Sequence, residues 1–200
     1  MRLAHHGVRL LALLILASCA DSAKKDPLSS GGSAGPHDKV LRGDYTIDSQ
    51  ESLSDLASKG GESFLITGNL AIQNSDLTEL VGLDGLTSVG GDLLISDNAS
   101  LFSLRGLGNL ETITGFLDIG TNANLRDLDG LNQLRRVGSF LIVGFNSSMT
   151  DIDGLSNLSH VGTVGIQILL NPVLANVDGL RGITAVGDLS YLEESFHAQS

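Results

Sequence analysis

Apolar residues recur along this chain with a period of 24 residues from Leu77 onward. Written in rows of that length, the chain shows five aligned apolar columns, each three positions from the next. The columns are Leu77, Leu101, Leu125, Met149 and Leu174; Leu80, Leu104, Leu128, Ile152 and Val177; Leu83, Leu107, Leu131, Leu155 and Leu180; Leu86, Leu110, Leu134, Leu158 and Ile183; and Val89, Ile113, Val137, Val161 and Val186. The last step of each column is 25, which places one extra residue between Val161 and Asn171. A fixed period in this range predicts a solenoid of stacked coils.

Each period also predicts a short strand, clearest at residues 116–119 and 140–143, where apolar residues alternate with others. The side chains expected to point inward are Leu93 and Ile95, Leu117 and Ile119, and Leu141 and Val143. Strands of successive coils then stack in parallel, about 4.8 Å apart.

The two ends of such a stack need covers. Asp48 and Glu51 have the spacing of a capping box and predict a helix that ends at Gly60. Leu53, Leu56 and Ala57 share one face of this helix, which we expect to cover the first coil. At the other end, residues 191–196 are the only candidate lid.

Two columns of polar or small residues accompany the apolar ones. Asparagines follow the strands at Asn98, Asn122, Asn146 and Asn171, and we expect them to form a buried hydrogen-bonded ladder. Glycines recur at Gly82, Gly106, Gly130, Gly154 and Gly179, which predicts a positive-φ or crowded turn in every coil.

The repeated string, as it stands in residues 83–98, resembles the receptor L domain, and Gly43 to Ile47 followed by a short helix resembles its start. The resemblance covers residues 42–192 and implies a right-handed parallel β-helix, a leucine-rich-repeat-like solenoid that binds ligands. Animal receptor L domains carry disulfides, whereas the single cysteine here is Cys19. The ligand-binding residues of those receptors have no matching motif, so none is carried over. The predicted fold is therefore mainly β, with coils of about 24 residues and a short N-terminal capping helix.

The N-terminus predicts a membrane anchor. Arg2 and Arg9 precede an apolar run at residues 10–17, which is too short to span a bilayer and has the length of a signal-peptide core. Residues 16–19 (LASC) resemble the lipobox of bacterial lipoproteins, which implies lipid attachment at Cys19. We therefore expect a signal peptide at 1–18, a flexible tether at 19–41 and the solenoid at 42–200, in the bacterial cell envelope at the outer membrane or cell surface.

Residues on the outward strand positions and the following turns are candidates for ligand binding. They are Phe116, Asp118, Phe140, Ile142, Phe145, Leu169 and Leu170. Outward apolar side chains are typical of a contact surface, although stacking along a ladder or cover by another segment would also explain them.

Asp129, Asp153 and Asp178 form a further column before the repeated glycines. Stacked carboxylates favour a bridging calcium ion, whereas an Asx turn before glycine is the structural alternative. No other metal or cofactor is indicated.

Charge and chemistry narrow the function classes. The net charge of −11 disfavours nucleic acid as a partner. His160 is the one candidate catalytic histidine inside the repeats, but no Ser-His-Asp relay converges on it in the sequence pattern. The sequence thus predicts a lipid-anchored, non-enzymatic module that presents one face to a protein or glycan. A self-associating envelope or adhesion component and a carbohydrate-active enzyme are the alternatives.

Overall fold

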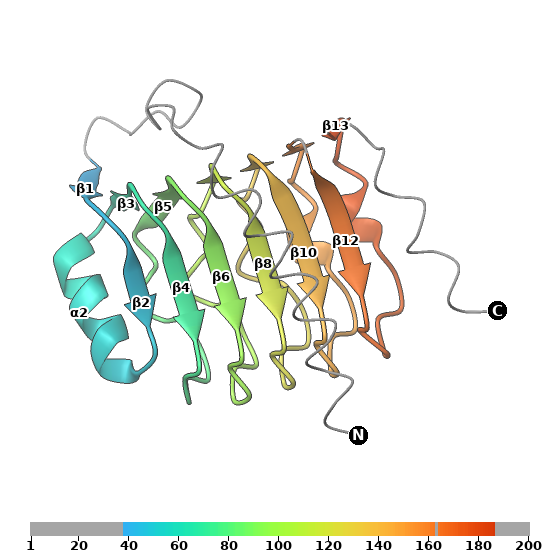
Figure 1. Cartoon of the computed structure of the whole chain (residues 1–200), viewed down its shortest axis with the longest axis horizontal. Coiled ribbons are helices and arrows are strands. Elements are labelled where there is room, and N and C mark those ends of the chain that lie inside the picture. The colour runs from blue at the N-terminus through green and yellow to red at the C-terminus, as the bar shows by residue number, and fades with distance from the viewer. Residues whose placement is uncertain (1–37, 163, 187–200) are drawn as a thin grey trace. The chain divides into compact units, whose positions relative to one another are not determined.

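The computed structural model describes residues 38–162 and 164–186. This part of the chain is mainly β, with two parallel sheets and one α-helix (Figure 1). The predictions for the signal peptide, Cys19, most of the tether and the C-terminal lid lie outside the described residues.

The chain alternates between the two sheets, so that each period contributes one strand to each. The seven-stranded sheet contains β1 (Lys39–Leu41), β3 (Phe64–Ile66), β5 (Leu86–Val89), β7 (Thr112–Ile113), β9 (Arg136–Val137), β11 (His160–Val161) and β13 (Ala185–Val186), in that order. The six-stranded sheet contains β2 (Tyr45–Ile47), β4 (Leu70–Gln73), β6 (Leu93–Ser96), β8 (Leu117–Gly120), β10 (Phe140–Gly144) and β12 (Gly165–Leu169). Both sheets therefore follow chain order, strand beside strand (Figure 1).

The strand register confirms the predicted period. Leu93 pairs with Leu117 and Leu117 with Leu141, each offset by 24 residues. The offset is still 24 where Val161 pairs with Val137, but it is 25 where Gly165 pairs with Phe140. The extra residue predicted between Val161 and Asn171 therefore lies between Val161 and Gly165.

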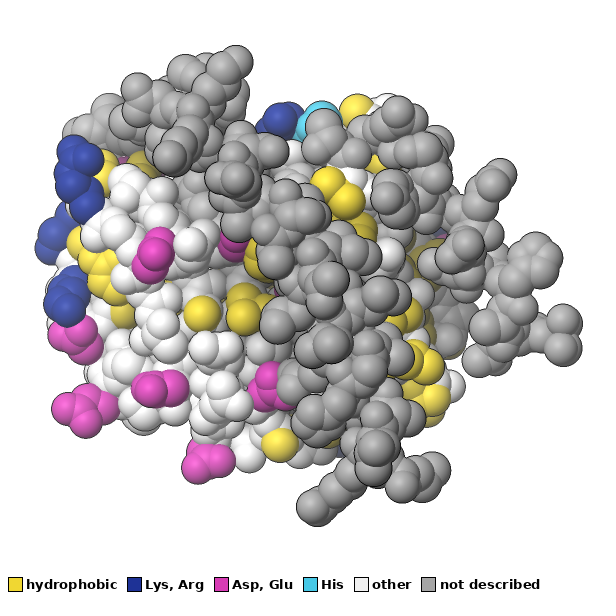
Figure 2. All heavy atoms as spheres, viewed as in Figure 1, with side chains coloured by type: hydrophobic (Ala, Val, Ile, Leu, Met, Phe, Trp, Pro, Cys, Tyr) yellow, Lys and Arg dark blue, Asp and Glu magenta, His cyan; other side chains and the backbone are white. Residues whose placement is uncertain are grey.

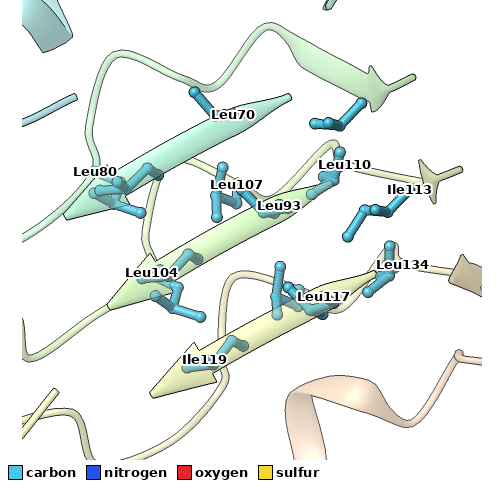
Figure 3. Packing of buried hydrophobic residues seen from close by; sticks show 14 of the residues in the cluster. Leu70, Leu80, Leu93, Leu104, Leu107, Leu110, Ile113, Leu117, Ile119 and Leu134 are labelled. Atoms are coloured by element: carbon cyan, nitrogen blue, oxygen red, sulfur yellow. The ribbon is translucent and has the colours of Figure 1, made fainter. Parts of the chain in front are cut away.

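The space between the sheets is filled by the predicted apolar columns. Their members from Leu80 to Val161 are fully buried in one cluster, together with the inward strand residues (Figure 3). The last member of each column is less covered: Leu174, Leu180 and Ile183 are partly buried, and Val177 is 49% exposed. Val177 thus departs from its column, in which all the other members are buried.

Helix α2 (Gln50–Gly60) forms where the sequence predicts it, but its caps differ. The N-cap is Ser49 and not Asp48, and its reciprocal partner is Ser52 and not Glu51. The helix continues through Gly60 and is capped by Gly61 at φ 78°. Leu53 and Leu56 are buried against the first repeats, at the end of the sheets that holds β1 and β2 (Figure 1).

The seven-stranded sheet includes residues that the sequence assigned to the tether. Residues 39–41, assigned to the tether from the sequence, form β1 and pair with β3. The Asp38 side chain accepts hydrogen bonds from Ser63 Oγ and Thr87 Oγ1. The boundary at residue 42 was wrong because the small and polar residues of this stretch hide a strand of only three residues.

The glycine column uses both predicted properties, and Gly106 and Gly130 combine them, because a Cβ there would also collide with the backbone oxygen of Leu80 or Leu104. Gly82, Gly106 and Gly130 have φ of 120°, 115° and 115°, a conformation that L side chains rarely adopt. Gly154 and Gly179 lie instead in the short 3₁₀ helices η1 (Asp153–Leu155) and η2 (Asp178–Leu180). There a Cβ atom would collide with the backbone oxygen of Leu128 or Ile152.

Candidate functional site

The predicted asparagine ladder is present. Asn98, Asn122 and Asn146 are fully buried, and each Oδ1 accepts the backbone N–H one repeat earlier: Ser75 N–H on Asn98, Asn98 N–H on Asn122, and Asn122 N–H on Asn146, at 3.0–3.2 Å. Each Nδ2 donates to a strand carbonyl of the preceding repeat, as from Asn122 to Ile95 O at 2.8 Å. Asn171 continues the ladder and Ser75 begins it. These residues are structural, because every amide group is used inside the fold.

A second ladder, not predicted from the sequence, runs along the opposite corner. Asp44 Oδ1 accepts from Asn69 N–H, Asn69 Oδ1 from Asp92 N–H, and Asp92 Oδ1 from Phe116 N–H, at 2.7–3.0 Å. The signal in the sequence was an Asx residue directly before β2, β4 and β6, which is hard to see because the steps are 25 and 23 residues and not 24. Burial raises the pKa of Asp92, and the nearby Asp44 carboxylate acts in the same direction, while the Phe116 N–H opposes it.

The second ladder changes character at Phe116. Phe116 and Phe140 occupy the register positions of Asp92 in the next two repeats, directly before Leu117 and Leu141. A phenyl ring has no acceptor to offer the next repeat, so the column turns from polar to aromatic at this point.

Two residues of the outward column are covered, which was the alternative to an open contact surface. Phe140 and Ile142 are only 6% and 8% exposed, although both lie outside the interior cluster that holds Leu141 and Val143. Phe116 and Asp118 are partly exposed. Asp118 lies between Leu94 and Ile142 in register, as the sequence pattern predicts.

Three of the candidate residues come together where β10 and β12 end. Phe145 follows β10, and its N–H donates to Leu169 O at 3.1 Å. Leu169 lies over Gly144, where a Cβ would be 3.1 Å from Leu169 Cγ, and Leu170 is 59% exposed. We call Phe145, Leu169 and Leu170 the C-terminal apolar surface. On the visible face, hydrophobic side chains appear beside β12, and the acidic ones lie over β2 to β8 (Figure 2). Phe116 does not belong to this surface, because it directly precedes β8.

The backbone at this surface adopts an unusual conformation. The residue before each ladder residue has a positive φ: Asn74 54°, Asp97 59°, Thr121 60°, Phe145 59° and Leu170 52°. Asn and Asp tolerate this left-handed region, whereas it costs other L residues about 1–2 kcal/mol. Phe145 and Leu170 therefore hold apolar side chains at positions where the backbone disfavours them. Sequence reasoning missed this column, although Asn74 and Asp97 at one position are a left-handed signal.

Asx turns are present at the aspartate column of Asp129, Asp153 and Asp178, but the residues of the column supply the N–H groups and not the side-chain acceptors. Asp127 Oδ1 accepts from Asp129 N–H, and Asp151 Oδ1 from Asp153 N–H, so the acceptor stands two residues before the predicted aspartate. In the same way, Asp178 N–H donates to Asn176 Oδ1. The Asp178 carboxylate also forms an ion pair with Arg181 at 2.8 Å. Among the described residues, no group of three or more His, Cys, Asp or Glu is arranged to hold a metal ion.

His160 lies on the seven-stranded sheet with Arg136 as its cross-strand neighbour. Burial lowers its pKa, and the Arg136 guanidinium adds to the effect. The geometry places the histidine beside a cation and not beside an acid that would orient it as a catalytic base.

No helix in the described ranges is long and apolar enough to cross a membrane. Comparisons of the chain with protein-family models, with curated proteins and with solved structures found no match.

Proposed function

We propose that this chain is a non-enzymatic binding module, tethered to the bacterial cell envelope through a lipid on Cys19, which recognises a protein through its C-terminal apolar surface. Its repeats would form a right-handed parallel β-helix similar to a receptor L domain. The role of the solenoid would be passive, because a rigid stack holds recognition side chains at fixed spacing.

The strand register supports the solenoid. The chain passes from one sheet to the other in every repeat, and both sheets add strands in chain order with offsets of 24 residues over β6 to β10. The string at residues 83–98 supports the family resemblance, and residues 16–19 with the preceding apolar run support the anchor.

The observation that carries the binding role is the pair of left-handed apolar residues, Phe145 and Leu170. Asn74 and Asp97 fill the same position in earlier repeats, so the fold itself does not require an apolar side chain there. Backbone strain of this kind is typical of functional positions, because the residue is retained for what it contacts. The apolar character of the surface favours a protein over a glycan.

Self-association is the second candidate, because exposed apolar side chains continue through the last described repeat. Val173 and Val177 are 51% and 49% exposed and lie in the same repeat as Leu170. An envelope component that stacks copies of itself at this end would cover them.

The test is a double variant, Phe145→Asn with Leu170→Asn, in the detergent-solubilised full chain. Asn relieves the left-handed strain at both positions, so we expect the free energy of unfolding to be unchanged or to rise by roughly 1 kcal/mol. Recovery of specific envelope proteins in pull-downs should fall at least tenfold relative to wild type. A stabilised chain that has lost binding would separate recognition from folding.

Thr121→Asn is the matched control. Thr121 has φ 60° at the same position of its repeat, but its side chain is small and is not part of the C-terminal apolar surface. This variant should gain stability and keep its partners. Equal recovery of partners by wild type and the double variant would overturn the proposal. Concentration-dependent sedimentation of wild type, abolished in the double variant, would instead assign the surface to self-association.

A further inference from the structure

A shallow depression of about 400 Å³ lies beyond the asparagine ladder, on the loop side of the repeats. It is lined by Ser100, Phe102, Asn124, Arg126 and Ser148. Ser100, Asn124 and Ser148 share one column at offsets of 24 residues, and Phe102 and Arg126 share another. The lining thus comes from three successive repeats and spans roughly 10 Å, since repeats stack about 4.8 Å apart.

The floor of this depression is held by backbone hydrogen bonds between repeats. Phe102 N–H donates to Thr78 O at 3.1 Å, and Thr150 N–H donates to Arg126 O at 2.7 Å. The Phe102 ring is 46% exposed although the neighbouring Leu101 is fully buried. A half-exposed aromatic ring on a hydrogen-bonded backbone therefore lies in one depression with a guanidinium, an amide and two hydroxyls.

We propose that this depression is a glycan-binding site that takes a neutral pyranose disaccharide. The C–H face of one sugar ring would stack on Phe102. Hydroxyl or acetamido oxygens would accept hydrogen bonds from Arg126 and Asn124, and the Ser100 and Ser148 hydroxyls would flank them. Arg126 is available for this role because it forms no ion pair with a described residue. The span of three repeats matches the length of two linked sugar rings.

A neutral sugar fits better than an acidic one. Asp127 directly follows Arg126. Burial is the main cause that raises the pKa of Asp127, and the Asp129 and Asp151 carboxylates raise it further, whereas the Asp129 N–H and the Arg126 guanidinium lower it. Three aspartates therefore lie around the one arginine of the lining, and together with the net charge of −11 they oppose a carboxylate or sulfate on the ligand.

This site shares no residue with the C-terminal apolar surface and does not depend on the function proposed for that surface. The experiment is ligand-observed NMR and calorimetry on the detergent-solubilised full chain, with chitotriose, cellotriose and maltotriose as neutral probes and trigalacturonate as the charged one. We expect at least one neutral probe to bind with a Kd on the order of 1 mM, because a shallow site buries little of its ligand. The charged probe should bind more weakly.

Phe102→Ala and Arg126→Gln should each weaken that binding at least tenfold. Phe102→Tyr, which keeps the ring, should bind like wild type, as should Arg105→Gln, which changes an arginine outside the depression. Phe102 is half exposed, so unchanged thermal melting will show that the Ala variant is folded. Absence of binding by every neutral probe, tighter binding of trigalacturonate, or Phe102→Ala binding like wild type would each overturn the proposal. The Phe145→Asn with Leu170→Asn variant should keep its sugar affinity, so failure of either proposal is distinguishable from failure of the other.

Discussion

At the scale of the residue, the structure shows how polar groups are admitted into an apolar interior. Asn122 is fully buried, yet its Nδ2 donates to Ile95 O and its Oδ1 accepts from Asn98 N–H. An amide buried without these partners would cost several kcal/mol. The second ladder works in the same way with Asp44, Asn69 and Asp92, but there a carboxylate is half buried, and its ionisation opposes folding.

Asp92→Asn is expected to stabilise the protein at neutral pH. Burial raises the pKa of Asp92 above its ordinary 3.8, so the folded state holds the proton more tightly than the unfolded chain. The stability that the protonated form contributes is complete below the unfolded pKa and is lost as the pH rises through the folded pKa. Asn removes the charge and keeps the acceptor for Phe116 N–H, as Asn69 does one repeat earlier.

The measurement is thermal melting of wild type and Asp92→Asn between about pH 3 and pH 7. The melting temperature of the variant should exceed that of wild type at pH 7, and the difference should shrink as the pH falls toward 3.8. A difference that stays constant with pH would mean that the carboxylate of Asp92 is not destabilised in the folded state.

At the scale of the element, short strands and one helix are tied together by columns that run across them. Strands of two to five residues have few hydrogen bonds of their own, and each gains stability from the neighbouring repeat. The asparagine ladder connects four repeats at the turn after the six-stranded sheet. Helix α2 covers the end of the sheets that holds β1 and β2, where its Leu53 and Leu56 are buried.

Asn122→Ala should therefore lower the free energy of unfolding by more than most alanine substitutions do. It removes the acceptor of Asn98 N–H and of Asn98 Nδ2 and the donor to Ile95 O, all three of which remain buried. We expect the free energy of unfolding to fall by about 3 kcal/mol or more, measured by urea denaturation. Asn109→Ala is the control, because exposed Asn109 donates only to Asp84 O, and its loss should stay below about 1 kcal/mol. Similar losses in the two variants would contradict a structural role for the ladder.

At the scale of the whole molecule, the register makes one repeat interchangeable with the next. The offsets of 24 residues mean that β8 presents to β10 the same pattern that β10 presents to β12, apart from the extra residue before Gly165. If the proposed solenoid is right, contacts are confined to neighbouring repeats, and stability is a sum over repeats and their interfaces.

Deletion of residues 122–145, one full period, should leave a folded protein. Thr121 then precedes Asn146, the asparagine ladder closes over the gap, and β8 meets β12 in the register that β10 had. We expect a β-type circular dichroism spectrum and a cooperative melt at a lower temperature. Deletion of residues 122–133, half a period, should abolish the melt, because Thr121 would join directly to Leu134 and the repeat would lose Asn122 and the buried Leu125, Leu128 and Leu131. Equal behaviour of the two deletions would refute the repeat architecture.

Much of the fold could be predicted because the interior columns are local and repetitive. The column from Val89 to Val186 was visible in the sequence and is paired residue by residue in β5, β7, β9, β11 and β13. The candidate site was predicted less well. Phe140 and Ile142 share the alternation of an outward strand face, but alternation does not tell whether an outward side chain is covered, and both are buried.

The sequence by itself determined the period, the inward residues and the presence of one extra residue after Val161, because burying apolar side chains from every repeat leaves only one register for the strands. Only the tertiary structure decided which polar side chains bond across repeats, as in the ladder through Asp92, and which turn residues are left-handed. It also revealed the depression around Phe102. These features depend on which groups of neighbouring repeats meet in space, and a pattern along one chain does not contain that distance.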